Sequence, residues 1–326
     1  VSAVLMYQAG RYPECVRWLL AAEPLINQDT PIHVVAQFRL GLALVGLHGG
    51  VESSRRMLLL DQAARTFETE ASHHLLVLTL CMRAYVASVR GDFDTADASL
   101  ARSGEVIELH RLEALKGLRL YNVGMLRRYQ GRAEEALVAF EESLPLVRNG
   151  GDSRLLFYIE NNLAATHLEL GRVEEALSRY AALIEVMQGS SRADAQMMAF
   201  ALMWQLHALT IQGSLEAAAA KVAQALPHCR RSIGVRHFAG MLALLAARQG
   251  RLHLAALLVG CDEAARARRG EIRMPSASTA LAATLALIDA AHAPDVVATW
   301  RQQGGALDDD ATIALLSKLT AERSVG

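Results

Sequence analysis

The chain has 326 residues, of which 52% are hydrophobic and 21% are charged, with 33 Lys and Arg against 34 Asp and Glu. The hydrophobic fraction excludes a generally disordered chain, and the balanced charge argues against a nucleic-acid-binding module, which usually carries a basic excess. Ala and Leu dominate while β-branched and aromatic runs are sparse, so we expect an all-α fold with almost no strand.

A short pattern recurs from the start of the chain: a glycine, often an acidic residue soon after it, and a small residue five positions on. Its clearest copies begin at Gly91, Gly131 and Gly171, and their spacings are 131 − 91 = 40 and 171 − 131 = 40 residues. With the weaker copies, the phased glycines are Gly10, Gly50, Gly91, Gly131, Gly171, Gly213 and Gly250. This nearly constant spacing predicts about seven copies of one structural unit.

Each unit is predicted to be a pair of antiparallel helices. The glycine ends the first helix, because glycine adopts the left-handed conformation without a Cβ penalty. Acidic residues then suit the N-terminal end of the second helix. Small residues seven positions before the glycine, such as Ala84 and Gly124, and five positions after it, such as Ala96 and Ala136, allow the two helices to pack closely.

The unit resembles the tetratricopeptide repeat (TPR), most closely over residues 161–180 and nearly as well over residues 124–140. The resemblance implies a TPR-like α-solenoid that coils as a right-handed superhelix. The period of about 40 residues is longer than the usual unit of about 34 residues, and it is similar to that of the sensor regions of large bacterial transcriptional regulators. We expect residues 1–270 to form the repeats and residues 271–326 to form a C-terminal helical cap.

The pattern changes after Gly250. We expect, in order, a helix over residues 252–270, a turn with Pro275, a helix over residues 276–291, a break at Pro294, a short helix around Trp300, a turn at Gly304 and Gly305, and a last helix capped from Asp308. This layout resembles the end of bacterial regulators that carry a winged-helix or LuxR-type DNA-binding domain and a STAND-like ATPase domain. The resemblance implies that this chain is the sensing part of such a regulator, with those domains covalently linked to it.

No catalytic or metal-binding constellation stands out. The motifs G-x-x-x-x-G-K-[ST], H-E-x-x-H and G-x-S-x-G are absent, so we expect no enzyme activity, no cofactor and no metal. The four cysteines are scattered and are interpreted as buried reduced thiols of a cytoplasmic protein, with disulfides as the alternative: Cys15, Cys81, Cys229 and Cys261. Neither a signal peptide nor a run of about 18 apolar residues is found, so no membrane contact is expected.

The densest basic cluster comprises Arg266, Arg268, Arg269 and Arg273. A solvated helix end is the preferred interpretation, since cations favour the C-terminal end of a helix. Contact with DNA phosphates is the alternative. Because the overall charge is balanced, we expect no direct contact between this chain and nucleic acid.

Ligand-binding residues are predicted on the first helix of each pair, which lines the concave face of such a solenoid. Repeat phasing places ten side chains there: Tyr85, Tyr121, Met125, Arg128, Tyr158, Asn161, Asn162, Met203, Trp204 and His207. Exposure to the groove is expected for Tyr121, Arg128 and Asn161. Packing in the core is an equal alternative for Met203 and Trp204, and a hydrogen-bonded histidine of the core or groove is preferred for His207.

Two functions from different classes follow. The first is a non-catalytic sensing region that binds a small-molecule effector, a peptide or a protein in the groove, and controls the linked ATPase and DNA-binding domains by a shift between solenoid curvatures. The alternative is a stand-alone scaffold or adaptor that docks peptides. An adaptor is expected to carry Lys and Asn clusters for carboxylates, and Lys116, Lys221 and Lys318 are not spaced for that.

Overall fold

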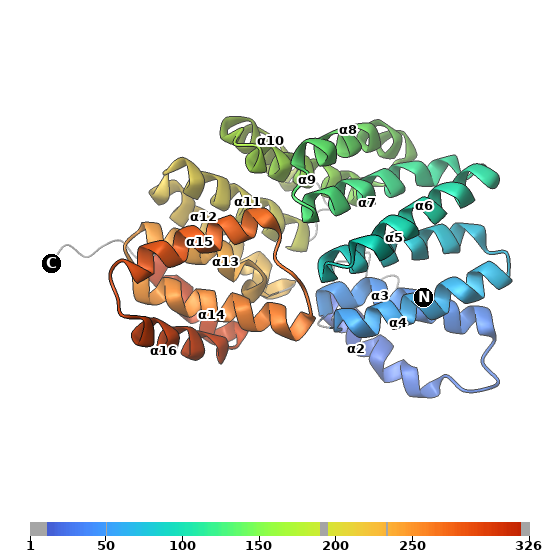
Figure 1. Ribbon diagram of the computed structural model, residues 1–326, viewed down its shortest axis with the longest axis horizontal. Helices are drawn as coiled ribbons and strands as arrows, with labels where there is room; N and C mark the ends of the chain where they lie inside the picture. The colour runs from blue at the N-terminus through green and yellow to red at the C-terminus, as the bar shows by residue number, and fades with distance from the viewer. Residues whose placement is uncertain (1–11, 50, 190–194, 233, 321–326) are drawn as a thin grey trace. The chain divides into compact units, whose positions relative to one another are not determined.

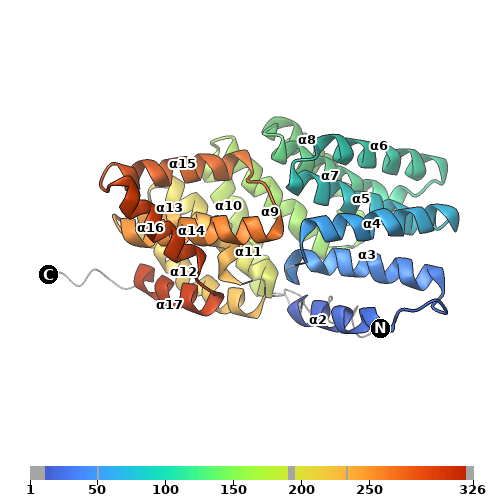
Figure 2. The ribbon, with the colours of Figure 1, turned by 60° about the horizontal axis from the view of Figure 1, so that its bottom comes forward.

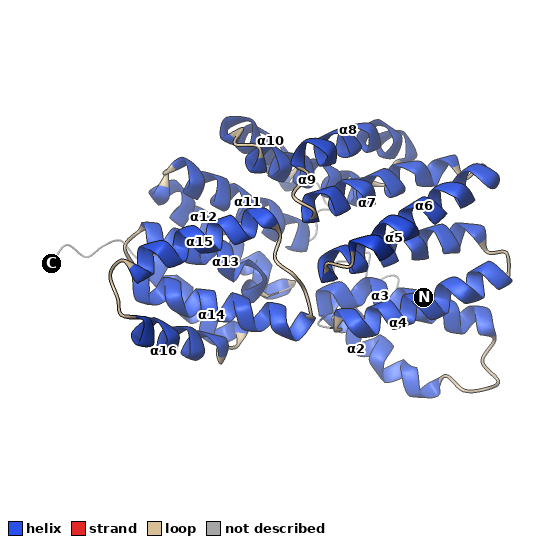
Figure 3. Cartoon of the chain, in the orientation of Figure 1, coloured by secondary structure: helices blue, strands red, loops and turns tan. Residues whose placement is uncertain are grey.

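The computed structural model describes residues 12–49, 51–189, 195–232 and 234–320. These residues form sixteen α-helices and three short 3-10 helices, and no strand occurs among them (Figure 3). The predicted all-α fold is therefore confirmed. The predicted turn glycines Gly10 and Gly50 lie outside the described residues.

The chain divides into two compact units. Unit 1 comprises residues 1–166 and 269–272, and unit 2 comprises residues 167–268 and 273–326. The sequence predicts a different division, with repeats over residues 1–270 and a cap over residues 271–326. That division was drawn from the repeat pattern and not from contacts, and it stays a prediction.

Unit 1 is built from consecutive helices that pack in antiparallel pairs (Figure 1). Its helices are α2 (Tyr12–Ala22), α3 (Ile32–Gly49), α4 (Ser53–Thr69), α5 (His73–Arg90), α6 (Phe93–Leu109), α7 (Lys116–Tyr129), α8 (Ala133–Gly150) and the greater part of α9 (Ser153–Glu169), with 3-10 turns η1 (Glu23–Leu25) and η2 (Glu113–Leu115). The pairs are α3 with α4, α5 with α6, and α7 with α8. Figure 2 shows α3, α4 and α5 side by side, and α5 also contacts α7, so the first helices of the second and third of these pairs are neighbours.

Unit 2 continues the pairing and ends in helices that fold back on it. Its helices are α10 (Val173–Gln188), α11 (Ala195–Gln212), α12 (Leu215–Arg231), α13 (Ala239–Arg248), α14 (Leu252–Arg269), α15 (Pro275–Asp289), α16 (Pro294–Gly305) and α17 (Asp309–Thr320), with the 3-10 turn η3 (Val235–Phe238). Within it α11 packs on α12, α15 packs on α13, and α17 packs on α12. Two of the last helices, α15 and α17, therefore pack on helices of the final repeats, and the C-terminal cap stays a prediction.

The phased glycines end the first helices as predicted. At Gly131, φ is 75°, and the next residue, Arg132, donates its N–H to the carbonyl of Arg127 over 2.8 Å. This is the Schellman arrangement, which satisfies carbonyls that the helix itself leaves unpaired and requires a left-handed residue. All five phased glycines among the described residues have φ between 75° and 96°: Gly91, Gly131, Gly171, Gly213 and Gly250.

Small residues form the contact between the two helices of a pair. The alanines five positions after each phased glycine are all completely buried: Ala96, Ala136, Ala176, Ala218 and Ala255. Four positions further along the same helices, Leu100, Phe140, Tyr180, Val222 and Val259 are buried too. Both observations confirm the packing predicted from the repeat, in which one small and one large side chain are placed on the same helical face.

The tail differs from its prediction in one place. Gly304 and Gly305 do not form a turn but lie in the last turn of α16. A Cβ on Gly304 would collide with the carbonyl of Leu257, and one on Gly260 would collide with the carbonyl of Arg301. These glycines therefore let α14 and α16 approach backbone to backbone. Pro294 begins α16, where its missing N–H costs nothing, and Asp308 caps α17 by accepting the N–H of Ala311 over 2.8 Å.

Candidate functional site

The ten predicted binding residues all lie on first helices of the repeat pairs. In unit 1, α5 carries Tyr85, α7 carries Tyr121, Met125 and Arg128, and α9 carries Tyr158, Asn161 and Asn162. In unit 2, α11 carries Met203, Trp204 and His207. The residues of each unit form a separate group, and the ligand-binding role of both groups stays a prediction.

A polar cluster joins α7 to α9 in unit 1. The guanidinium of Arg128 donates a short hydrogen bond from Nη1 to Oδ1 of Asn162. The amide of Asn162 donates in turn to the carbonyl of Tyr158 over 2.7 Å and to the hydroxyl of Tyr121 over 3.4 Å. Four predicted residues from two neighbouring first helices are thus brought together around one amide group.

The expectation that Arg128 and Asn161 are exposed is wrong. Only 2% of Arg128 and 4% of Asn161 is accessible to solvent, and Asn162 and Met125 are buried as well. Neighbouring first helices pack closely here, and the Asn162 amide supplies the acceptor that allows a guanidinium to be buried. Tyr121 and Tyr158 are partly buried, so their rings form the accessible part of the cluster.

A second group in unit 1 surrounds a buried arginine that the sequence interpretation missed. Arg56 on α4 is 1% exposed, and its Nε donates to the carbonyl of Ala43 over 2.9 Å. A hydrogen bond joins Tyr85 to Tyr129 beside it. Burial, helped by the negative charge of Glu271, raises the pKa of Tyr85 to about 12. Burial lowers the pKa of Arg56, while the charges of Tyr85 and Glu271 oppose that shift, so these groups act on one another.

In unit 2, Met203 lies in the core and His207 is buried away from solvent. Met203 is 0% exposed, which agrees with the core alternative, while Trp204 is partly buried and its ring lies edge-on to His207 at 5.9 Å between centroids. Burial lowers the pKa of His207 to about 4, and the positive charge of Arg248 contributes to the shift. Nδ1 of His207 is buried and has no hydrogen-bond partner among the described residues. His207 is therefore neutral at neutral pH.

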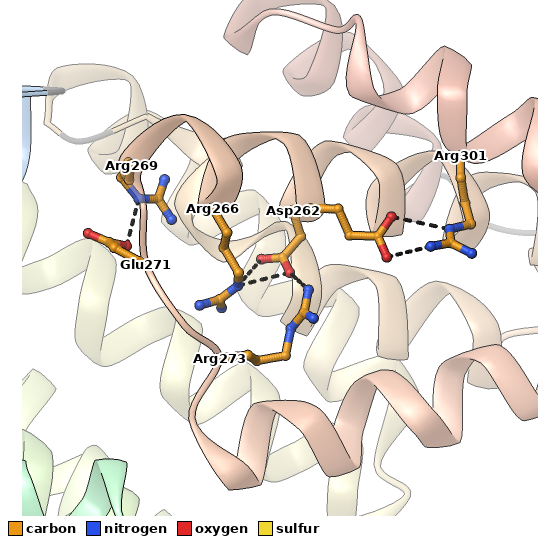
Figure 4. Close-up of polar contacts among 7 residues, drawn as sticks. Asp262, Arg266, Arg269, Glu271, Arg273 and Arg301 are labelled. Carbon is orange, nitrogen blue, oxygen red and sulfur yellow. Dashed lines mark hydrogen bonds and ion pairs between the residues drawn. The ribbon is translucent and has the colours of Figure 1, made fainter. Parts of the chain in front are cut away.

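The arginine cluster of the tail is engaged in ion pairs. Asp262 on α14 is buried, and it accepts from Arg266 over 3.0 Å and from Arg273 (Figure 4). Within unit 1, Arg269 pairs with Glu271 over 2.8 Å. The interpretation as a solvated helix end is therefore wrong for these three arginines, because nearby carboxylates neutralise them. Asp262 is the residue that the sequence interpretation missed, since nothing in its local pattern marked it as buried.

Other chemistry-bearing residues give no sign of a reactive centre in the described parts of the chain. No group of three or more His, Cys, Asp or Glu is arranged there to hold a metal ion. The four cysteines are buried, as predicted, and are free thiols in the structure; burial raises the pKa of Cys81 and Cys229 to about 12. Of the helices formed by the described residues, none combines the length and the apolar character needed to cross a membrane.

Comparison with known proteins supports the repeat interpretation. A family model described as "Tetratricopeptide repeat" matches residues 118–189, which include α8, α9 and α10 and most of α7. Over residues 118–189 the chain is thus similar to the tetratricopeptide repeat. Among solved structures, it is similar to NprR in complex with its cognate peptide NprX, at 14% sequence identity and a TM-score of 0.59. The match covers 94% of this chain and 90% of the NprR chain. At this low identity the similarity shows a common fold and nothing further. No curated protein sequence matches the chain.

Proposed function

We propose that this chain is the non-catalytic sensing region of a bacterial transcriptional regulator and that it binds a peptide signal on the surface of α7 and α9. The observation that carries the proposal is the polar cluster in which the buried Arg128 and Asn162 are joined to Tyr121 and Tyr158, which are both partly exposed. Apolar residues would pack two helices at lower desolvation cost than a buried guanidinium does. A charged group at such a position is better explained by recognition than by stability.

The fold is suited to a peptide signal. Repeats of this kind stack into extended surfaces that are used for binding, and the similar NprR structure contains NprR with its cognate peptide. Tyr side chains combine a large apolar ring with a hydroxyl group, which makes them frequent anchors of binding surfaces. A ligand that favours one arrangement of the helices would shift its population and so control the ATPase and DNA-binding domains proposed to be linked to this chain in a cytoplasmic regulator.

The binding test uses the full chain and a phage-displayed library of random heptapeptides. Enriched peptides are synthesised and their affinity is measured by calorimetry. Tyr158→Ala is expected to weaken binding by about tenfold or more, as truncation of an aromatic anchor does. Val138→Ala, on the exposed face of α8, is the matched control and is expected to leave the affinity unchanged. Circular dichroism shows whether each variant is folded. Failure to enrich any peptide, or equal losses in both variants, would argue against the proposal.

The alternative, a stand-alone adaptor, predicts the same surface but no linked domains. The coding sequence on the 5′ side of the Val1 codon separates the two. A P-loop ATPase and a winged-helix or LuxR-type domain in the same reading frame support the regulator. A start codon directly before Val1 supports the adaptor.

A further inference from the structure

A segment between α14 and α15 packs on unit 1 in the way that an extended peptide would. Residues 269–272 belong to this unit, and residues 271–274 have no helical structure. The N–H of Ile272 donates to the carbonyl of Val89 over 2.7 Å, and the hydroxyl of Ser53 donates to the carbonyl of Gly270 over 2.9 Å. The second contact joins residues that are 217 positions apart in the sequence.

Both contacts are made by groups at the ends of helices, a backbone carbonyl of α5 and a side-chain hydroxyl of α4. Val89 lies in the last turn of α5, where the carbonyls have no partner within the helix, and Ser53 is the first residue of α4. Arg90 supports the serine by donating to its hydroxyl over 3.2 Å. The hydrogen bonds to the segment are therefore directed at its backbone, which is how a protein holds an extended peptide of variable sequence.

Two side chains of the segment add specificity. Ile272 lies over Gly91, since a Cβ built there would be 3.3 Å from Cγ2 of Ile272. Glu271 pairs with Arg269 of the same segment over 2.8 Å, and its charge also acts on Arg56 and Tyr85. Because Arg56 is a buried cation, a carboxylate brought to this place gains more from the attraction than it would at an exposed site.

We propose that Ser53, Arg56, Tyr85 and Val89 form a binding site for an extended peptide that contains an acidic residue, and that residues 269–272 occupy this site as an internal ligand. An incoming peptide with an acidic residue followed by an aliphatic one displaces the segment. The inference rests on the proposed peptide-binding function and extends it to the surface of α4 and α5. It adds regulation, because occupation by the tethered segment lowers the apparent affinity for any competing peptide.

The strength of this competition follows from the tether. A covalently attached ligand acts at an effective concentration on the order of millimolar, which a free peptide has to exceed. Variants that release the segment are therefore expected to bind the same peptide more tightly. Gly270→Ala is one such variant, because φ of Gly270 is +63° and an added Cβ would lie 2.9 Å from the hydroxyl of Ser53. Ile272→Pro is another, because proline has no N–H to donate to Val89.

The probe is a fluorescently labelled peptide with the sequence of residues 267–274, titrated with the full chain and followed by fluorescence anisotropy. Gly270→Ala and Ile272→Pro are each expected to bind it about tenfold or more tightly than the unaltered chain, because the competitor has been removed. Gly150→Ala is the matched control, since a Cβ at Gly150 meets nothing within 4 Å. A probe with Glu271→Gln is expected to bind the released variants about tenfold more weakly, because it lacks the charge that Arg56 attracts.

The proposal is overturned if both released variants keep the circular-dichroism signal of the unaltered chain and bind the probe no more tightly than the unaltered chain does. Residues 269–272 would then be a structural part of unit 1. This result can be distinguished from failure of the proposed function, because that function is tested separately, by binding of library peptides and by the effect of Tyr158→Ala on α9. Tight binding of the probe to the released variants without any library peptide for α7 and α9 would support the internal ligand and reject the proposed signal surface.

Discussion

Gly124 on α7 lies so close to the ring of Phe140 on α8 that a Cβ added to the glycine would sit 2.5 Å from Cε1 of the ring. Phe140 is completely buried. The pair unites two predictions from the repeat, a small residue seven positions before the turn glycine and a large one nine positions after it.

Gly124→Ala is expected to destabilise unit 1 by about 1–3 kcal/mol, because overpacking forces a buried ring out of its preferred position. Urea denaturation followed by circular dichroism measures the change. Gly41→Ala is the matched control: Gly41 also lies inside a helix, and a Cβ there meets nothing within 4 Å. That variant is expected to be stabilised by about 0.5–1 kcal/mol through the helix preference of alanine. Equal effects of the two substitutions would contradict the close contact with Phe140.

Asp262→Asn is expected to destabilise unit 2 by about 3 kcal/mol, because Arg266 and Arg273 lose the buried charge that neutralises them. The same substitution at Asp97, whose side chain is 50% exposed and pairs with Arg127 over 3.3 Å, is expected to cost less than about 1 kcal/mol. Thermal melting of both variants gives the comparison. A cost at Asp262 as small as that at Asp97 would show that its ion pairs contribute little.

His207 makes stability depend on pH in a defined window. Because its pKa is about 4 in the folded chain, against 6.5 for an ordinary histidine, the unfolded chain binds a proton between these values that the folded chain does not. The free energy of unfolding therefore falls as the pH is lowered from 6.5 to about 4, by on the order of 3 kcal/mol, and this contribution is constant above that window. His207→Gln is expected to remove that part of the pH dependence. Denaturation curves at several pH values, with the exposed His74→Gln as control, measure it.

The thiols are expected to be inert in the folded protein. The raised pKa values of Cys81 and Cys229 leave almost no thiolate at pH 8, and all four cysteine side chains are buried. Ellman's reagent is expected to react with fewer than one thiol per folded chain and with all four once the chain is unfolded in guanidinium chloride. Rapid reaction of a thiol in the folded chain would show that its helix opens readily.

Local patterns were sufficient to predict much of the fold. The phased glycines and the alanines five residues later each depend on the backbone within one turn of helix, so Gly131 and Ala136 could be interpreted without knowing the rest of the chain. The turn predicted at Gly304 and Gly305 failed for the opposite reason. Those glycines serve a contact with Leu257 on another helix, and a glycine alone does not indicate whether it bends the chain or admits a neighbour.

The candidate site was less predictable than the fold. Helix phase placed Tyr121, Arg128 and Asn162 on one side of their helices, and the structure brings them together. The helical phase of a residue does not indicate how closely the neighbouring helix approaches. The burial of Arg128 between α7 and α9 was therefore missed. Arg56 and Glu271 were missed because their proximity depends on parts of the chain more than 200 residues apart, which no periodic pattern encodes.

The contact of Ser53 with Gly270 also determines an order of events during synthesis. At roughly 5–20 residues per second, a ribosome adds the 217 residues from position 54 to position 270 in roughly 10 to 40 s. Helices α4 and α5 are therefore made long before their covering segment exists. A nascent chain passes through a period in which this surface is not yet covered by residues 269–272.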